Sequence, residues 1–419
     1  MIKAVTGTKD ILPIDISKWL VLEKLIRSTM SSYNYSEIRT PVFEETSLFA
    51  RGIGEATDIV SKEMYTFLDR SGDSLTLRPE MTASVIRAFI EHSLSKKQSL
   101  NKLYYIGPMF RQERPQAGRF RQFHQFGAEA IGSNDPLLDA EMITMAFDII
   151  NRLGLKNLSV VINSLGVPES RENYKKVLRE FLKPSFDKLS EDSRKRFDTN
   201  ILRIFDSKDE RDKSIMENAP LLIEHLDEDS LVHFDKVKTA LLSSKIPFVV
   251  DPKLVRGLDY YTHTTFEIVS GSVGSQSALC GGGRYNGLVK ELGGEDLPGV
   301  GFASGIERIL LACENENTLS TDDDNIDLYI VLLDKDKQDF AYKNAVELRR
   351  KNLTVELDYL SRSVKAQMRE ANRFNTKYVL LVGGEEFEKG EVVLKNMNDG
   401  NQINIGKEDL DKIISIVKG

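Results

Sequence analysis

Two apolar, aromatic runs joined by an arginine-rich turn are the most constraining feature of this 419-residue chain. The runs are Leu103–Phe110 and Phe120–Ile131, and their aromatic and aliphatic residues are typical of β-strands. Pro115 and Gly118 lie between the runs, where a tight turn is expected. The sequence therefore predicts two strands that return on each other around a charged turn.

Positive charge is concentrated on this hairpin, whose four arginines are Arg111, Arg114, Arg119 and Arg121. A guanidinium group presents a planar set of donors that matches phosphate oxygens in pairs. The neighbouring rings of Phe110, Phe120 and Phe123 can stack a base. The pattern indicates a nucleotide or nucleic-acid site, and an exposed basic hairpin over a few core aromatics is the alternative.

Composition narrows the class of protein. The formal net charge of −7 excludes a polycation, so any contact with nucleic acid needs a local basic patch such as the hairpin. The two cysteines, Cys280 and Cys313, have no Cys-x-x-Cys spacing, and the five histidines are scattered, which argues against disulfides and zinc. No apolar run is long enough for a membrane span or a signal core, so we expect a cytoplasmic protein.

The hairpin resembles motif 2 of the class II aminoacyl-tRNA synthetases. The resemblance rests on Phe110, Arg111 and Glu113, followed by the basic loop and the returning strand. Gln122–Glu129 narrows it to the histidyl-tRNA synthetase version of that motif. Outside the hairpin, a helical pattern over Ile16–Tyr33 and an extended segment to Phe43 resemble motif 1, which implies a homodimer. A helix and a strand packed inside a monomer have the same pattern.

Three later segments strengthen the resemblance. Pro298–Arg308 resembles motif 3 of class II synthetases, a strand followed by a helix that carries an arginine. Leu254–Thr262 and Leu279–Leu288 resemble the two histidine-specific signatures of the family. The glycine run Gly281–Gly283 is interpreted partly as a turn and partly as room for close approach of a ligand. Asn286 stands where the second signature usually carries aspartate.

The implied fold is an α+β catalytic domain with an antiparallel sheet flanked by helices, over residues 1–320. A charged, glycine-poor stretch at about 166–246 predicts a helical insertion, which by position implies contact with the tRNA acceptor stem. A solvated helical subdomain without that role is the alternative. Arg51–Glu55 is expected to be a flexible loop and Glu314–Asn325 a linker. Alternating strand and helix patterns over 326–419 predict an α/β domain, which in the family binds the anticodon.

A strand at Leu75–Glu80 leads into a predicted helix, with Thr82 expected as its cap. The resemblance implies that Glu80 and Thr82 bind the histidine ammonium group, where a carboxylate gives a charge-assisted bond. The implied histidine-binding residues are Glu80, Thr82, Arg111, Gln125, Glu129, Arg256, Tyr260 and Tyr261. Among them, Glu129 and Tyr261 would meet the imidazole ring. Met81 replaces the glycine usual in the family, so its side chain is expected to point away from the ligand.

The resemblance also implies an ATP site. Arg111 and Arg256 would be the catalytic pair that flanks the α-phosphate, and Arg308 would hold the γ-phosphate. Phe123 would stack on the adenine and Glu113 would accept from its amine. Fixed positive donors suit this reaction because the attacking carboxylate and the phosphate are both anions. Mg²⁺ is expected to accompany ATP, and no protein ligand is assigned to it.

The activity implied is an ATP-dependent histidine–tRNA ligase, which activates L-histidine and transfers it to the 3′ end of tRNA(His). The alternative is a non-catalytic paralogue, the regulatory subunit of ATP phosphoribosyltransferase in histidine biosynthesis. Met81 and Asn286 favour the paralogue. The retained arginines and the additional C-terminal domain favour the ligase.

Overall fold

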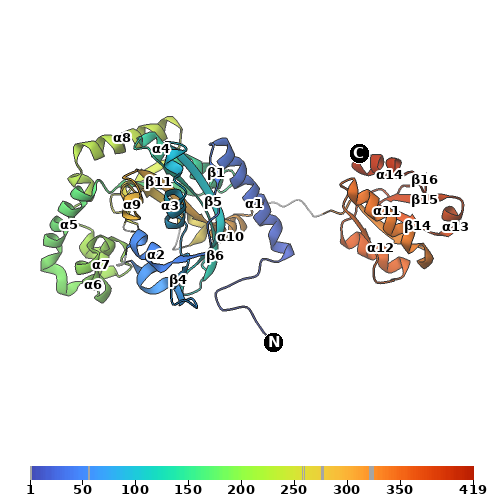
Figure 1. Ribbon diagram of the computed structural model, residues 1–419, viewed down its shortest axis with the longest axis horizontal. Coiled ribbons are helices and arrows are strands. Elements are labelled where there is room, and N and C mark those ends of the chain that lie inside the picture. Colours follow the sequence, from blue (N-terminus) through green and yellow to red (C-terminus); the bar gives the residue numbers. More distant parts are fainter. Residues whose placement is uncertain (1, 55–56, 257, 259, 275–277, 320–324) are drawn as a thin grey trace. The chain divides into compact units, whose positions relative to one another are not determined.

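The computed structural model describes residues 2–54, 57–256, 258, 260–274, 278–319 and 325–419 (Figure 1). Two compact units make up the chain, Met1–Ser320 and Thr321–Gly419. Within the described ranges, none of the helices combines the length and the apolar run that a bilayer crossing requires.

An eight-stranded sheet forms the centre of the first unit. In spatial order its strands are β1 (Ser36–Glu37), β5 (Asn101–Phe110), β6 (Gln122–Ile131), β11 (Gly299–Gly305), β10 (Ala278–Arg284), β9 (Thr262–Ser270), β7 (Leu158–Ser164) and β8 (Phe248–Val250). Neighbouring strands from β5 to β7 are antiparallel, whereas β1 pairs with β5 and β8 with β7 in parallel. The predicted antiparallel sheet is confirmed, and it is mixed at its two edges.

Helices α1 (Pro13–Ser32), α4 (Pro136–Asn151), α8 (Glu228–Ser243) and α10 (Ile306–Glu316) pack against the sheet in one hydrophobic cluster. Proline at the first helical position begins both α1 and α4, where its missing N–H costs nothing. The Asp135 side chain caps α4 by accepting from the amide of Leu137 at 2.9 Å. The apolar faces of these helices therefore cover one face of the sheet.

The segment between β1 and the hairpin forms a smaller group of strands and helices. It contains a three-stranded sheet of β2 (Phe43–Glu45), β4 (Ser74–Leu77) and β3 (Tyr65–Leu68), with helices α2 (Thr46–Ile53) and α3 (Thr82–Glu91) and a π-helical turn at Ile59–Glu63. The prediction of a loop at Arg51–Glu55 is wrong for its described part, because Arg51–Ile53 end α2 and Gly54 follows; Glu55 lies outside the described residues. Burial of Phe49 and Ile53, one helical turn apart, stabilises this helix.

The stretch between β7 and β8 is helical, as predicted. Its helices are α5 (Pro168–Leu182), α6 (Glu191–Thr199), α7 (Glu210–Met216) and α8, with 3₁₀ turns at Lys183–Lys188, Ile201–Asp206 and Leu222–His225. Tyr174, Leu178 and Leu182 belong to a separate hydrophobic cluster here, which also includes Tyr261. The insertion therefore packs directly against a residue that the sequence places in the histidine site.

The second unit contains a five-stranded sheet with helices around it (Figure 1). Its strands are β13 (Val355–Leu357), β12 (Leu328–Leu332), β14 (Tyr378–Val382), β15 (Glu391–Asn396) and β16 (Gln402–Gly406), and its helices are α11 (Gln338–Arg350), α12 (Val364–Arg373), α13 (Gly384–Glu388) and α14 (Leu410–Lys418). β12 pairs in parallel with β13 and with β14, whereas β15 pairs antiparallel with both β14 and β16. The predicted α/β fold is confirmed, although β16 and α13 were not expected.

A buried ion pair joins the sheet to α4. Arg284, at the end of β10, and Asp139, in the first turn of α4, have fully buried side chains whose Nη2 and Oδ2 atoms lie 2.5 Å apart. Arg284 also donates to the carbonyl oxygen of Ser133 at 2.9 Å. Breaking such a pair leaves a charge buried without compensation.

We expect Asp139→Asn to lower the free energy of unfolding of the first unit by about 3–5 kcal/mol. Urea unfolding followed through Trp19, the single tryptophan, measures this unit because Trp19 lies in its core. Glu191→Gln is the control, since it removes an exposed pair with Lys195 and should change little. A loss no larger than that of the control would contradict a structural role for the buried pair.

Candidate active site

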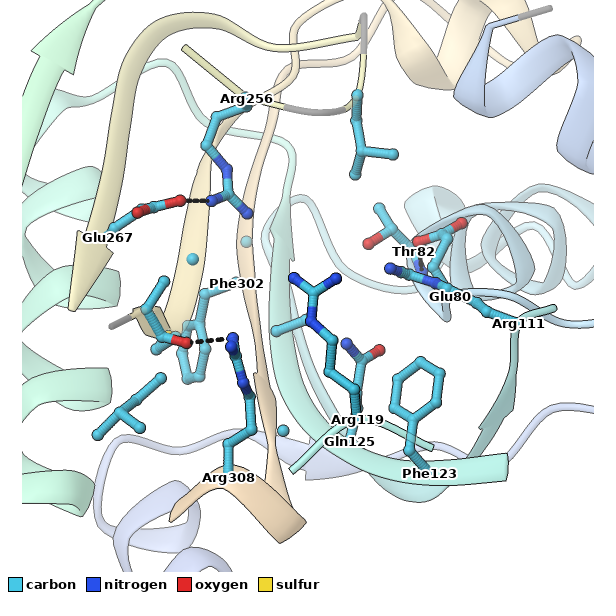
Figure 2. Close-up of a pocket in the computed structure, with 18 of the residues that line it drawn as sticks. Glu80, Thr82, Arg111, Arg119, Phe123, Gln125, Arg256, Glu267, Phe302 and Arg308 are labelled. Atoms are coloured by element: carbon cyan, nitrogen blue, oxygen red, sulfur yellow. Dashed lines mark hydrogen bonds and ion pairs between the residues drawn. The ribbon is translucent and has the colours of Figure 1, made fainter. Parts of the chain in front are cut away.

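A cavity of about 280 Å³ lies on the face of the sheet opposite the α1–α4 layer. Every residue that the sequence assigned to a site lines it: Glu80, Thr82, Arg111, Glu113, Phe123, Gln125, Glu129, Arg256, Tyr260, Tyr261 and Arg308. These residues come from segments far apart in the sequence, and Figure 2 shows many of them turned toward one space. The fold thus brings the predicted set together.

Strand alternation decides which side chains of β6 reach the cavity. Phe126 and Ala128 belong to the hydrophobic cluster under the helices. Phe123, Gln125 and Glu129, an odd-numbered set, line the cavity on the other face. The even spacing of Gln125 and Glu129 in the sequence therefore corresponds to a shared face in the structure.

Glu80 and Thr82 lie at the beginning of α3, and Glu80 rather than Thr82 caps the helix. The Glu80 carboxylate accepts from the amides of Thr82 at 2.7 Å and Ala83 at 2.8 Å, and so caps the helix. Thr82 is the first helical residue, and its hydroxyl donates instead to Glu129 at 2.7 Å. The prediction that Thr82 caps this helix is therefore wrong.

Glu129 is a buried carboxyl group with two hydroxyl donors. Thr82 donates to Oε1 and Tyr285 donates to Oε2, at 2.7 and 2.6 Å. Burial raises the pKa of Glu129 to about 8, with a further contribution from the nearby Glu80, although the two hydroxyl bonds oppose the shift. A Cβ on Gly301, its neighbour across the ladder to β11, would lie 1.8 Å from Oε2. Glycine is therefore required beside this carboxyl group.

Tyrosines surround the Glu129 end of the cavity. The rings of Tyr260 and Tyr261 lie 4.7 Å apart, and Tyr260 meets Tyr285 edge to face at 5.9 Å. The buried hydroxyl of Tyr105, which is not part of the cavity lining, has no hydrogen-bond partner in the part of the chain that the structure describes. This end combines apolar ring faces with a few fixed polar groups, which suits a small aromatic ligand.

Four guanidinium groups line the cavity (Figure 2). Those of Arg119, Arg256 and Arg308 form what is here called its arginine end, and that of Arg111 lies beside Glu80. Arg111 donates to the carbonyl oxygen of Pro79 at 2.8 Å, and Arg308 donates to that of Ala278 at 2.6 Å. Arg256 forms an ion pair with Glu267 on β9. Each of these three side chains is held by a specific acceptor, so their positions are fixed before any ligand binds.

Burial and neighbouring charges shift the pKa values of Arg308 and Arg256 in opposite directions. Burial lowers the pKa of Arg308, and the nearby positive charge of Arg119 lowers it further. Burial would also lower the pKa of Arg256, but Tyr261 and Glu267 raise it above its ordinary value. Arginine remains protonated in proteins, so this end of the cavity stays positive and favours an anionic ligand.

The glycines of the second signature lie in the middle of β10, so the interpretation of Gly281–Gly283 as a turn is wrong. A Cβ on Gly281 would lie 2.4 Å from Nη2 of Arg256, and one on Gly282 would lie 2.3 Å from the carbonyl oxygen of Gly301. The glycines leave space for an arginine and for the neighbouring strand. Gly257 and Asp259, in the first signature, lie outside the described residues.

The two departures from the family pattern do not reach the cavity. Met81 is 2% exposed and packs with Val85, Tyr105 and Met109. Its side chain is thus directed away from the cavity, as expected. Asn286 donates to Asn134 at 2.9 Å and has no atom in the cavity lining.

Sequence reasoning assigned no specific ligand contact to Arg119, Glu267 or Tyr285, which also line the cavity. Arg119 was visible as part of the basic hairpin, and Tyr285 lies inside the second signature. Glu267 had no local signal, because its pairing with Arg256 depends on the position of β9 in the sheet. Within the described ranges, no three His, Cys, Asp or Glu side chains are grouped to hold a metal ion.

Known proteins identify the family of this chain. The profile described as "Histidyl-tRNA synthetase" matches residues 7–309, and the profile described as "Anticodon binding domain" matches residues 327–416. The chain belongs to the histidyl-tRNA synthetase family. A histidine–tRNA ligase from Halothermothrix orenii is 49% identical over 404 residues, which cover 96% of each chain. One from Geobacillus kaustophilus is 50% identical over 403 residues, covering 95% of this chain and 94% of the relative.

Solved structures agree with this family. The crystal structure of apo S. aureus histidyl-tRNA synthetase superposes with a TM-score of 0.84 at 40% identity, with full coverage of both chains. A Bacillus halodurans protein described as an ATP phosphoribosyltransferase regulatory subunit/histidyl-tRNA synthetase matches at 20% identity with a TM-score of 0.66, covering 92% of this chain and 99% of its own. That second likeness shows a common fold and gives no support to the regulatory-subunit alternative.

The raised pKa of Glu129 predicts a pH-dependent stability. A carboxyl group with a folded pKa of about 8 and an ordinary unfolded pKa stabilises the fold at low pH, and this contribution is lost as pH rises through about 8. We expect the free energy of unfolding to fall by up to about 1.4 kcal/mol per pH unit between pH 6 and 8. In Glu129→Gln, whose amide retains both neighbouring bonds, this part of the slope should disappear.

Urea unfolding of both proteins at pH 6, 7, 8 and 9 measures the difference. Glu191→Gln, the same substitution at an exposed site, should keep the wild-type slope. Parallel profiles for the wild type and Glu129→Gln would show that Glu129 does not titrate in this range.

Proposed function

We propose that the chain is an ATP-dependent ligase that joins L-histidine to tRNA(His). The observation that carries the proposal is a single cavity lined both by a buried acid among tyrosines and by four guanidinium groups. Family membership and relatives of nearly equal length support the same reaction. The first step makes histidyl-adenylate and pyrophosphate, and the second transfers the histidyl group to the 3′ end of the tRNA.

Arg111 and Arg256 are the proposed catalytic pair. The carboxylate of histidine attacks the α-phosphate of ATP, a bond to oxygen forms at phosphorus, and pyrophosphate leaves. Both reactants are anions, and the transition state gathers further charge on the phosphate oxygens. Guanidinium groups already fixed by Pro79 and Glu267 stabilise that charge without reorganising. The attacking carboxylate is ionised at neutral pH, so this step needs no general base.

Arg308 holds the γ-phosphate, Phe123 stacks on the adenine, and Glu113 accepts from the adenine amine. Arg111 lies 5.4 Å above the ring of Phe123, and Glu113 bonds Arg119 at 2.8 Å. ATP would therefore enter a space whose aromatic and acidic groups are already oriented by arginines.

Glu129 and Tyr261 select the imidazole ring, while Glu80, Thr82 and Gln125 hold the ammonium and carboxylate ends. A buried carboxyl group that must pair with a ring nitrogen rejects analogues without one by roughly 10⁴-fold or more. Because burial raises the pKa of Glu129 to about 8, the imidazole ring and the carboxyl group would share one proton on binding. This arrangement favours histidine over other amino acids of similar size.

Mg²⁺ is expected to enter with ATP. This ion commonly binds through substrate phosphates and one or two carboxylates, and keeps several waters. Besides Glu113, which is assigned to the adenine, the carboxylates of Glu267 and Glu307 line the cavity near Arg256 and Arg308, so one of these two would hold an ion brought by the nucleotide. Its chemistry would be to neutralise charge on the outer phosphates.

The remaining parts of the proposal concern tRNA and assembly. Residues 1–320 form the catalytic domain with its insertion at about 166–246, and residues 326–419 bind the anticodon. The match of an anticodon-binding profile to 327–416 supports the second assignment. A homodimer through the α1 region and a cytoplasmic location complete the proposal. The two cysteines are unpaired and buried, which suits a reducing compartment.

Histidine-dependent exchange of labelled pyrophosphate into ATP tests the proposal. We expect Arg111→Gln to lower the exchange rate on the order of 100- to 1,000-fold, as for loss of one preorganised donor. Arg114→Gln is the matched control, because this arginine lies on the same hairpin, is exposed and does not line the cavity. It should leave exchange nearly unchanged.

Exchange with another amino acid and none with histidine would refute the proposed substrate. Histidine binding without exchange, together with co-purification of a phosphoribosyltransferase, would favour the regulatory-subunit alternative.

A further inference from the structure

The loop at 112–120, here called the arginine loop, presents Glu113, Gly118, Arg119 and Phe120 to the cavity. It contains no helix or strand, and its internal backbone pairing is an isolated bridge between Gln116 and Arg119. A loop of this kind needs outside contacts to keep one conformation. Those contacts determine where its charged groups lie before ATP binds.

Two carbonyl groups from distant segments accept hydrogen bonds from the two sides of the arginine loop. Gly7 accepts from the amide of Arg121 at 2.7 Å, and Glu63 accepts from the amide of Gln112 at 2.7 Å. Between these points the amide of Arg111 donates to the carbonyl of Arg121 at 2.9 Å and extends the hairpin. The loop is therefore held at its base from both sides.

Residues Val5–Thr8, here called the strap, form a compact turn at this position. The amide and hydroxyl of Thr8 both donate to the carbonyl of Val5, at 2.9 and 2.7 Å. Gly7 has a φ of +89°, which side-chain-bearing residues rarely adopt. A Cβ on Gly7 would lie 2.8 Å from Cγ of Arg121 and 3.0 Å from Cγ of Pro115. Conformation and space both require glycine here.

The contacts continue from the strap to the cavity. The Arg121 guanidinium donates to the carbonyl of Thr6 and to that of Glu113, each at 3.4 Å. The Glu113 carboxylate bonds Arg119 at 2.8 Å. At the tip of the loop, a Cβ on Gly118 would lie 3.3 Å from Cγ of Arg308, so the loop rests on the stem of that arginine. A displaced strap would move several groups at the arginine end.

The histidine end does not depend on the strap. Glu80 is fixed by the amides of α3, and Glu129 is fixed by Thr82 and Tyr285. None of these bonds involves residues 112–120, and Arg111, which precedes the loop, is held separately by the carbonyl oxygen of Pro79. Movement of the loop should therefore change one end of the cavity and leave the other intact.

We propose that the strap is a positioning element for ATP, and that Gly7 is its positioning residue. By holding the base of the arginine loop, the strap orders Glu113 and Arg119 before the nucleotide arrives, which lowers the entropic cost of binding it. This inference rests on the proposed function, since ATP is the ligand assigned to that end.

The test compares Gly7→Ala with Gly72→Ala in pyrophosphate exchange. Gly72 has nearly the same φ, +92°, and a Cβ there meets nothing within 4 Å, so it reproduces the backbone strain without the clash. We expect Gly7→Ala to raise KM for ATP about tenfold, comparable to the loss of one hydrogen bond. Its KM for histidine and its kcat should stay within about twofold of the wild type, and Gly72→Ala should match the wild type throughout.

Arg121→Met provides a second variant that inserts no atom into the turn. It removes the guanidinium bonds to Thr6 and Glu113 and should raise KM for ATP in the same selective way, by a smaller factor. This variant decides the outcome if Gly7→Ala does not fold.

Limited trypsin digestion, followed by mass spectrometry, measures the loop without any assay of activity. Cleavage after Arg119 should be faster in Gly7→Ala than in the wild type or Gly72→Ala, since the loop is released. Equal cleavage rates, or a fall in kcat with unchanged KM for ATP, would contradict the proposed role of the strap. Absence of histidine-dependent exchange in the wild type would instead overturn the proposed function, and digestion would still test the strap.

Discussion

Repulsion among four guanidinium groups is the constraint on which the cavity depends. Arg111, Arg119, Arg256 and Arg308 line one cavity, and repulsion between like charges, such as that of Arg119 on Arg308, opposes this arrangement. Carbonyl oxygens and two carboxylates offset the repulsion by accepting from these side chains. Because the cluster remains positive, an anionic ligand is attracted to it. The free energy stored in folding these charges together is available to bind a nucleotide and to stabilise its reaction.

The strands beside the cavity carry glycines where side chains would fill the space that the charged groups occupy. Glycines at 281, 282 and 301 let a guanidinium group, a neighbouring backbone and a buried carboxyl group occupy volume that side chains would fill. Glycine in a strand weakens it, because more backbone entropy is lost and no side chain packs. The large hydrophobic cluster on the opposite face compensates, since α1, α4, α8 and α10 cover the same strands there. One face of the sheet provides stability and the other provides chemistry.

The two ends of the cavity are tuned by opposite means. At the acid end, burial raises the pKa of Glu129 so that the carboxyl group is largely neutral near pH 7. At the arginine end, charge persists despite burial because guanidinium groups keep their protons. The neutral, hydrogen-bonding end of the cavity suits an imidazole ring, and the positive end suits the phosphates of a nucleotide. The separation also explains why a change in the strap should affect one substrate and not the other.

The sequence by itself determined the family, the main strands and helices, and eleven of the residues that line the cavity, because the hairpin, the two signatures and the helix after Gly305 each carry a local pattern. Alternation along β6 was also enough to place Gln125 and Glu129 on one face. The tertiary structure decided which group does what at α3, where the longer side chain of Glu80 reaches the open amides and leaves Thr82 free for Glu129. It likewise decided that Arg51–Ile53 are helical, that Gly281–Gly283 lie within a strand, and that Glu267 and Gly7 meet Arg256 and Arg121. These are contacts between segments distant in the chain, and a local pattern carries no record of the partner that folding brings beside it.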